Sequence, residues 1–235
     1  MLCAFSRHSR CFESVTHDAV IFDMDGVLVD SERIIRDGFA AAADTLGHAL
    51  NHELFAQLIG TTSARTEAIL KARFGEDFPL ERMYAIAREH IDEATADGWP
   101  RRPGALALAE QLHAHGVPIA VASSTRRAGV EARLASTGLL PFVGAICAGD
   151  EVREGKPHPE IYERAAQRLG VAPQRCVGIE DSLHGIRAAH AAGLRTVLVP
   201  DLVAAPDPRP PEVHHVFENL DAVRPALSEW LGIGK

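Results

Sequence analysis

The chain has few cysteines and no long apolar run. Its 235 residues include four cysteines, and none of them forms a Cys-x-x-Cys pair. A small disulfide-stabilised scaffold is therefore excluded, and we expect buried free thiols in a reducing compartment. No apolar run approaches the roughly 20 residues that a membrane-spanning helix needs. Residues 1–16 contain basic side chains and serines without a sustained apolar segment or a cleavage site. We interpret them as a disordered N-terminal extension or the product of an upstream start codon, rather than a transit peptide, and expect a cytoplasmic protein.

The chain also lacks an excess of positive charge. Its formal net charge is −8, which disfavours nucleic acid and anionic membranes as partners. Phosphorylated small molecules stay compatible with this charge, because a bound metal ion can supply positive charge locally. The composition, 46% hydrophobic and 24% charged residues, is ordinary for a globular protein. The length favours one domain with a sizeable insert.

Five short apolar runs predict the strands of a sheet. They are nearly all apolar rather than alternating, which is typical of parallel strands that are covered on both faces. The runs are Ala19–Phe22, Pro118–Ala122, Gly144–Ala148, Cys176–Ile179 and Arg195–Val199. Helical patterns follow over 104–116, 158–170 and 181–193, each ending at a glycine. This alternation predicts an α/β fold with a Rossmann-like, doubly wound parallel sheet.

One long segment contains no strand candidate. From about residue 34 to 98 the pattern is helical only, with turns near Gly47, Gly60 and Gly75. The predicted helices span 33–46, 51–58, 63–74 and 79–96. Ligands of open α/β sheets bind at the carboxyl ends of the strands, and this segment directly follows the first strand. We therefore interpret 33–98 as an inserted helical cap that closes over a site, and 17–32 with 99–235 as the α/β core. A helical layer packed passively on the sheet is the alternative.

Polar side chains follow four of the predicted strands. Because parallel strands end at one edge of a sheet, we expect these side chains to converge. Carboxylates that share a crevice raise one another's pKa unless a cation neutralises them, and Mg²⁺ prefers oxygen ligands. A lysine and hydroxyls suit a phosphate group, so the cluster indicates phosphoryl transfer. The sequence has no GxxxxGK[ST] loop, which disfavours a P-loop nucleotide site. The side chains are Asp23, Asp25, Ser123, Ser124, Thr125, Lys156, Glu180, Asp181 and Ser182.

Each of these clusters has a simpler structural explanation when it is taken alone. Ser123–Thr125 and Asp181–Ser182 would serve as helix caps, and Lys156 as a solvated loop lysine. Asp23 and Asp25 are harder to explain in this way, because charges that end a buried strand need partners. The joint occurrence of the clusters favours a functional site.

Four segments together resemble the motifs of the haloacid dehalogenase-like (HAD) superfamily. They are DMDGVLVDSE, VASST, GKPHPEIY and GIEDSLHGIRAAHAAG, in the family's order, and the resemblance runs from about Asp18 to the C-terminus. The chain is most similar to the branch with a helical cap after the first strand, which holds many sugar-phosphate phosphatases and β-phosphoglucomutase.

The resemblance implies a role for each motif residue. Asp23 is the implied nucleophile, which forms an aspartyl-phosphate, and Asp25 is the implied general acid and base. Lys156 bridges the nucleophile and the phosphoryl oxygens. Ser123 lies at the position that binds the transferring phosphoryl group, with Ser124 in support. The implied Mg²⁺ site consists of Asp23, Asp25 through its backbone carbonyl, Asp181, and Glu180 as a ligand or a supporting acid.

The same resemblance allows several reactions to be weighed. A dehalogenase or a phosphonate-cleaving enzyme would not need Asp25. β-Phosphoglucomutase carries a histidine five residues after the last aspartate of its first motif, whereas here Ile35 follows Asp30 at that spacing. Its cap loop for a second phosphate is not matched by Gly60–Ser63, although Arg65 lies nearby. We therefore expect a Mg²⁺-dependent HAD-like phosphoric monoester hydrolase that acts on a small phosphorylated metabolite, a sugar phosphate, as a monomer or homodimer. A phosphosugar mutase and a catalytically silent metabolite-binding regulator are the alternatives.

Overall fold

A six-stranded parallel sheet forms the centre of the molecule, in the order β3-β2-β1-β4-β5-β6. The computed structural model describes residues 16–58 and 63–233. The five predicted strands are confirmed to within a residue at each end, and β6 is added at one edge, where its two residues give no apolar run. The strands are β1 (Ala19–Phe22), β2 (Ile119–Ser123), β3 (Ala145–Ala148), β4 (Cys176–Glu180), β5 (Arg195–Leu198) and β6 (His215–Val216).

Helices cover both faces of this sheet, as the unbroken apolar runs predict. Side chains alternate along β1, so Val20 and Phe22 pack into one hydrophobic cluster and Ala19 and Ile21 into another. The first cluster lies against α5 (Ala105–Ala114), α6 (Arg127–Ser136) and α9 (Leu220–Leu231), and the second against α7 (Glu160–Leu169) and α8 (Leu183–Ala191). Short 3₁₀ turns occupy Leu140–Phe142, Gly149–Glu151 and Pro173–Arg175. The four β1 side chains are at most 1% exposed, so the sheet is a doubly wound, Rossmann-like one.

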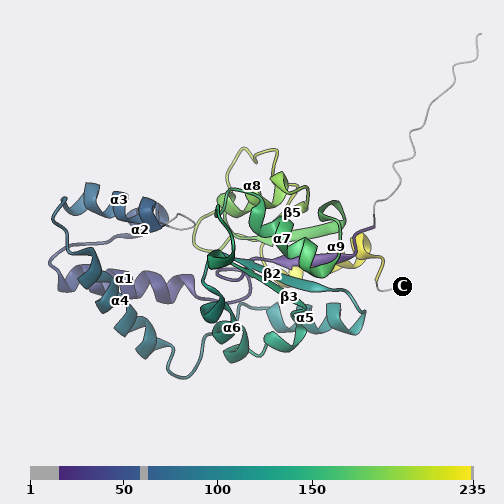
Figure 1. The fold of residues 1–235 in the computed structure, drawn as a ribbon, viewed down its shortest axis with the longest axis horizontal. Helices are drawn as coiled ribbons and strands as arrows, with labels where there is room; N and C mark the ends of the chain where they lie inside the picture. Colours follow the sequence, from purple (N-terminus) through teal and green to yellow (C-terminus); the bar gives the residue numbers. More distant parts are fainter. Residues whose placement is uncertain (1–15, 59–62, 234–235) are drawn as a thin grey trace, which may run out of the picture.

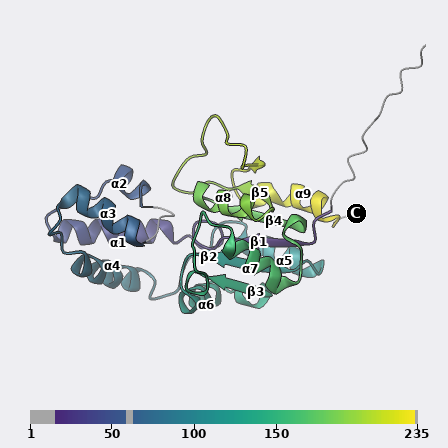
Figure 2. The same ribbon diagram turned by 45° about the horizontal axis from the view of Figure 1, so that its top comes forward.

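The segment after β1 contains helices and no strand in its described part, as predicted. The helices are α1 (Glu32–Thr45), α2 (His52–Ala56), α3 (Ser63–Phe74) and α4 (Leu80–Ala94). They share a hydrophobic cluster of their own around Leu70 and Met83, and Figures 1 and 2 show them gathered beside the sheet. We call α1–α4 the helical subdomain. The turn predicted near Gly60 lies outside the described residues.

Two short linkers join the helical subdomain to the sheet. They run side by side, with an isolated bridge between Val29 and Arg101. On the subdomain side, Arg33 of α1 donates to Asp201, which follows β5, at 2.7 Å. Arg102 of the second linker donates to the same carboxylate oxygen, also at 2.7 Å. This shared carboxylate holds the start of α1 over the carboxyl ends of the strands.

The remaining predictions concern cysteines and membrane helices. Cys147 and Cys176 are buried free thiols, as predicted, whereas Cys3, Cys11 and residues 1–15 lie outside the described residues. Over 16–58 and 63–233, no helix has both the length and the apolar character required to cross a bilayer.

Candidate active site

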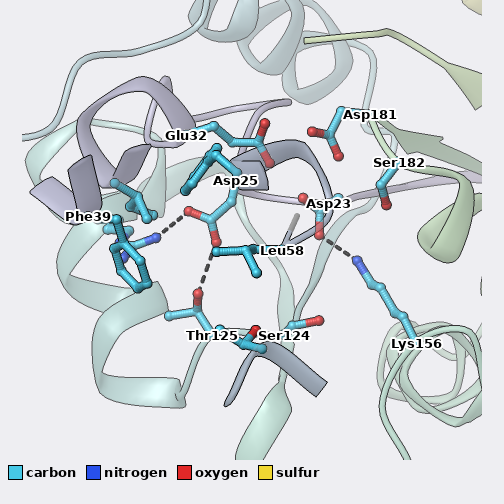
Figure 3. Close-up of a pocket in the computed structure, with 14 residues that line it drawn as sticks. Asp23, Asp25, Glu32, Phe39, Leu58, Ser124, Thr125, Lys156, Asp181 and Ser182 are labelled. Atoms are coloured by element: carbon cyan, nitrogen blue, oxygen red, sulfur yellow. Dashed lines mark hydrogen bonds and ion pairs between the residues drawn. The ribbon is translucent and has the colours of Figure 1, made fainter. Parts of the chain in front are cut away.

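The carboxyl ends of β1, β2 and β4 border a cavity of about 300 Å³, and side chains of the helical subdomain complete its lining. Figure 3 shows the residues that line it. Asp23 and Asp25 come from the turn after β1, Ser124 and Thr125 from the turn after β2, and Asp181 from the turn after β4. The other lining residues are Glu32, Ile35, Phe39, Phe55, Leu58, Thr66, Arg133, Lys156 and Ser182. Parallel topology therefore brings together side chains that lie more than 150 positions apart.

Lys156 is buried against two carboxylates. Its Nζ donates to Asp23 Oδ1 at 2.5 Å, to Glu180 Oε1 at 2.6 Å and to the Ala122 carbonyl oxygen at 3.0 Å. These three bonds use all the donors of the ammonium group. Burial favours the neutral amine, but the carboxylates of Asp23 and Glu180 outweigh it and raise the pKa of Lys156. The side chain is therefore a fixed positive charge beside Asp23.

Glu180 ends β4 and has no exposed surface. Besides Lys156, its Oε1 accepts from the Tyr162 hydroxyl at 2.7 Å, and its Oε2 accepts from the Ser182 hydroxyl at 3.1 Å. A Cβ at Gly185 would lie 1.7 Å from Glu180 Oε1, so only glycine in α8 leaves room for this carboxylate. Both oxygens of Glu180 are thus hydrogen-bonded within the protein, so we interpret Glu180 mainly as the anchor of Lys156 and less as a metal ligand.

Asp25 points toward a different set of partners. Ser31 donates to its Oδ1 at 2.6 Å, Thr125 donates to its Oδ2 at 2.9 Å, and Arg133 of α6 forms an ion pair with Oδ1. The Arg133 guanidinium lies 4.2 Å from the centre of the Trp99 ring, in a cation–π contact. Hydroxyls and a stacked guanidinium therefore hold the Asp25 carboxylate beside that of Asp23.

The remaining acids crowd the cavity. Burial, opposed by Lys156 and reinforced by Glu180, raises the pKa of Asp23 to about 7. Burial and the neighbouring Glu32 carboxylate raise the pKa of Asp181 well above its ordinary value. Burial, with Asp201 and other carboxylates, raises the pKa of Glu32 to about 8. Lys156 and Arg133, the cations among the described residues that line the cavity, do not offset this negative charge.

This acidic set fits a divalent cation. One carboxylate oxygen from each of Asp23, Glu180 and Asp181 lies within 4.8 Å of the others, and these are hard oxygen donors of the kind that Mg²⁺ prefers. Gly26 has a φ of +81°, and a Cβ there would lie 2.3 Å from Asp181 Oδ2. The glycine therefore lets the Asp181 carboxylate approach the backbone of the β1 turn. A bound cation would lower the raised pKa values of these carboxyl groups, because it stabilises their charged form.

The structure brings together all the residues that the sequence singled out, with one difference in detail. Ser124 borders the cavity, whereas Ser123 is fully buried and its hydroxyl accepts from the Thr125 amide at 3.1 Å. Ser182 is also a helix cap, since its hydroxyl accepts from the Gly185 amide at 3.1 Å.

Two cavity residues, Arg133 and Glu32, give little signal in the sequence. Arg133 reaches Asp25 from the middle of α6, far from any motif. Glu32 is typical of an acidic residue in the first turn of a helix. Thr125 was singled out with the hydroxyl cluster after the second strand, but nothing in the sequence distinguishes its role from that of Ser124.

Comparison with known proteins agrees with this geometry. The family model described as haloacid dehalogenase-like hydrolase matches residues 17–193. Protein CbbY of Rhodobacter capsulatus is 36% identical over 193 residues, covering 77% of this chain and 85% of CbbY. The phosphorylated carbohydrates phosphatase of Thermotoga maritima is 30% identical over 180 residues, covering 77% of this chain and 83% of that protein. A solved structure of a CbbY mutant from Rhodobacter sphaeroides in complex with xylulose-(1,5)bisphosphate superposes with a TM-score of 0.71 at 28% identity, covering 87% of this chain and 95% of that one.

Proposed function

The chain belongs to the haloacid dehalogenase-like hydrolases, in the branch of the sugar-phosphate phosphatases, and we propose that it cleaves a small phosphate monoester through an aspartyl-phosphate with the help of Mg²⁺. The observation that carries this proposal is the buried contact between Asp23 and Lys156 at the end of β1. It places a carboxylate and a fixed positive charge together in the lining of the cavity. Such a pair suits a nucleophile and the phosphoryl oxygens that it attacks.

In the first half of the reaction, a carboxylate oxygen of Asp23 attacks phosphorus, and the bond between phosphorus and the ester oxygen breaks. Asp25, in its protonated form, donates its proton to the departing oxygen, so that the product leaves as an alcohol. The positive charge of Lys156 faces the phosphoryl oxygens, and the hydroxyl of Ser124 is available to donate to them. The products of this half are the free alcohol and a phosphoryl group on Asp23.

In the second half, Asp25 takes a proton from water while the water oxygen attacks phosphorus. The bond between phosphorus and the Asp23 oxygen breaks, which releases inorganic phosphate and regenerates both carboxyl groups. The contacts of Asp25 with Ser31, Thr125 and Arg133 keep its carboxylate in place for both proton transfers.

The residues that would hold Mg²⁺ are Asp23 and Asp181, with the backbone carbonyl of Asp25. When bound, the ion would supply positive charge against the crowded carboxylates and the phosphoryl group. Glu180 supports this group through Lys156. The helical subdomain would act as a cap that excludes water from the aspartyl-phosphate. A cytoplasmic location and a monomeric or homodimeric state stay predictions of the sequence.

The test is phosphate release from a panel of monoesters, with Mg²⁺ and with a chelator. The panel includes hexose 6-phosphates, polyol phosphates, phosphoglycolate, β-glucose 1-phosphate and p-nitrophenyl phosphate. We expect metal-dependent release that Asp23→Asn lowers by at least about 10³-fold, while Asp37→Asn, at an exposed position of α1, keeps wild-type activity. Conversion of β-glucose 1-phosphate to the 6-phosphate without release would instead support a mutase. Ligand binding without turnover would support a silent regulator.

A further inference from the structure

The cavity has two unlike sides. On one side lie Lys156 and the carboxylates and hydroxyls that follow the strands, and on the other lie four apolar side chains of the helical subdomain, with Glu32 and Thr66 at their margin. We define the apolar wall as Ile35, Phe39, Phe55 and Leu58. We propose that this wall selects phosphate esters whose leaving group is uncharged and presents a hydrocarbon or ring face, and that it rejects a second phosphate or a carboxylate. This inference rests on the proposed function and names the substrate class of the same site.

Packing within the helical subdomain fixes the apolar wall. Ile35 and Phe39 are four residues apart on α1, so they lie one above the other on one helix face. The Phe39 ring meets that of Phe55 edge-on at 6.3 Å and that of Tyr84 at 5.9 Å. Ile35 and Phe39 are half-buried. The exposed part of each is therefore available to a ligand, while the rest of the side chain is held by its neighbours.

The wall lies on the side where the leaving group would be. Asp23 forms an ion pair with Lys156 at the end of the cavity where the phosphoryl group is proposed to bind. Figure 3 shows Phe39 and Leu58 on the Asp25 side and Lys156 on the opposite side. If Asp25 donates its proton to the ester oxygen, the carbon atoms attached to that oxygen continue toward the apolar wall.

The charges of the cavity disfavour a second anionic group. Among the described residues that line it, the cations are Lys156 and Arg133. Both are committed to carboxylates, Lys156 to Asp23 and Glu180, and Arg133 to Asp25. Among the described lining residues of the helical subdomain, a distal phosphate would thus meet hydrocarbon, the Glu32 carboxylate and the Thr66 hydroxyl, and no cation would replace its lost hydration.

Two further cations of the helical subdomain, Arg65 and Lys71, lie at different surfaces. Arg65 lines a hollow between α2 and α3, together with Asn51. Lys71 lines another hollow, with Glu67 and Glu76. Arg65 and Lys71 are not among the described residues that line the catalytic cavity. We therefore do not expect them to contact the leaving group.

The experiment compares matched substrate pairs that differ by one distal charge. The pairs are phenyl phosphate with 4-carboxyphenyl phosphate, and fructose 6-phosphate with fructose 1,6-bisphosphate. We expect kcat/KM for the neutral member to exceed that for the charged member by at least about tenfold, because a buried unpaired charge is rejected more strongly than a change in size. An equal or higher kcat/KM for the charged members would overturn the inference while leaving the phosphatase intact. No release from any ester, p-nitrophenyl phosphate included, would instead overturn the proposed function.

Substitutions of Ile35 test whether the apolar wall causes the discrimination between neutral and charged leaving groups. Ile35→Lys places a cation in the wall and should narrow the ratio within each pair by about tenfold. Ile34→Lys is the matched control, because Ile34 is the neighbouring half-buried isoleucine of α1 and is not among the residues lining the cavity. Its ratios should equal those of the wild type. Ile35→Asn is a smaller change and replaces Ile35→Lys in the test if that variant does not fold. It should lower kcat/KM for phenyl phosphate by about fivefold. Equal ratios in the Ile35 and Ile34 variants would show that the wall does not discriminate.

Discussion

Replacing Lys156 by methionine tests the charge arrangement on which the site depends. The substitution keeps an unbranched side chain but removes the ammonium group that Asp23 and Glu180 share. Lys156 and Asp23 are 8% and 6% exposed and Glu180 is not exposed, so water cannot readily replace the lost partner. Breaking a buried ion pair by removing one member lowers the free energy of unfolding by about 3–5 kcal/mol. At about 2–4 °C per kcal/mol for a chain of this size, we expect the Tm to fall by about 6–20 °C near neutral pH.

The loss should depend on pH, with a definite sign. In the wild type the raised pKa of Lys156 contributes stability that is fully present below the unfolded value of about 10.4 and is lost only as the pH rises through the folded pKa. Without the ammonium group, the pKa of Asp23 rises above about 7. When the folded pKa of a carboxyl group lies above its unfolded pKa, the free energy of unfolding of the protein falls as the pH rises from the unfolded to the folded value. The wild type stops losing stability through Asp23 above about pH 7, whereas the variant continues to lose it, so the Tm gap between the two proteins should widen as the pH rises above about 7.

Thermal unfolding followed by circular dichroism measures both effects. Arg175→Met is the control, because Arg175 pairs with Asp18 at the surface, with side chains 51% and 39% exposed. Such pairs contribute about 0–1 kcal/mol, so its Tm should change little. The double variant Lys156→Met with Glu180→Gln should recover part of the loss, since it removes one of the two uncompensated charges. A Lys156→Met protein with a wild-type Tm at about pH 8 would refute the reasoning.

Three further outcomes follow from the site. Mg²⁺ should raise the Tm relative to a chelator, and by more at about pH 8 than at about pH 5. The reason is that protons compete with the ion for Asp23 and Asp181, whose pKa values are raised. A Tm increase that is independent of pH would contradict this. Gly26→Ala should lower both the Tm and the Mg²⁺ affinity measured by calorimetry, since its Cβ would clash with Asp181 at a positive φ, at a cost of about 1–3 kcal/mol. Arg133→Gln should lower kcat by about tenfold or more with a small change in Tm, because it frees the Asp25 carboxylate; an unchanged kcat would show that Ser31 and Thr125 suffice.

The sequence predicts the features of the fold that depend on short-range patterns. Unbroken apolar runs such as Ala19–Phe22 identify the parallel strands, and glycines such as Gly170, which has a φ of 70°, mark where helices end. The parallel topology then implies that the polar residues after the strands converge. The two-residue strand β6 is too short for such a pattern, and its pairing with β5 depends on how the chain returns after the proline-rich loop.

Contacts that depend on the rotation of a helix could not be predicted in this way. Arg133 reaches Asp25 only because α6 packs on the sheet with this side chain facing the cavity, against Trp99. The same holds for Glu32, which faces Asp181 because the two linkers set the direction of α1. The apolar wall is another example: Ile35 was notable in the sequence as a missing histidine, but its place beside Phe39 and Phe55 comes from the packing of α1 on α2.

The charge balance of the cavity links the metal, the substrate and the apolar wall. Lys156 neutralises only part of the negative charge of Asp23 and Glu180, and Asp181 and Glu32 add more. A phosphate ester dianion that approaches this cavity without a bound cation meets a repulsive field, which low-dielectric walls strengthen. Substrate affinity should therefore be weak without the metal, even where the apolar wall fits the leaving group. The wall contributes selectivity among leaving groups, while the cation determines whether the phosphate is bound at all, so KM should depend strongly on Mg²⁺ concentration and the ranking of neutral leaving groups should not.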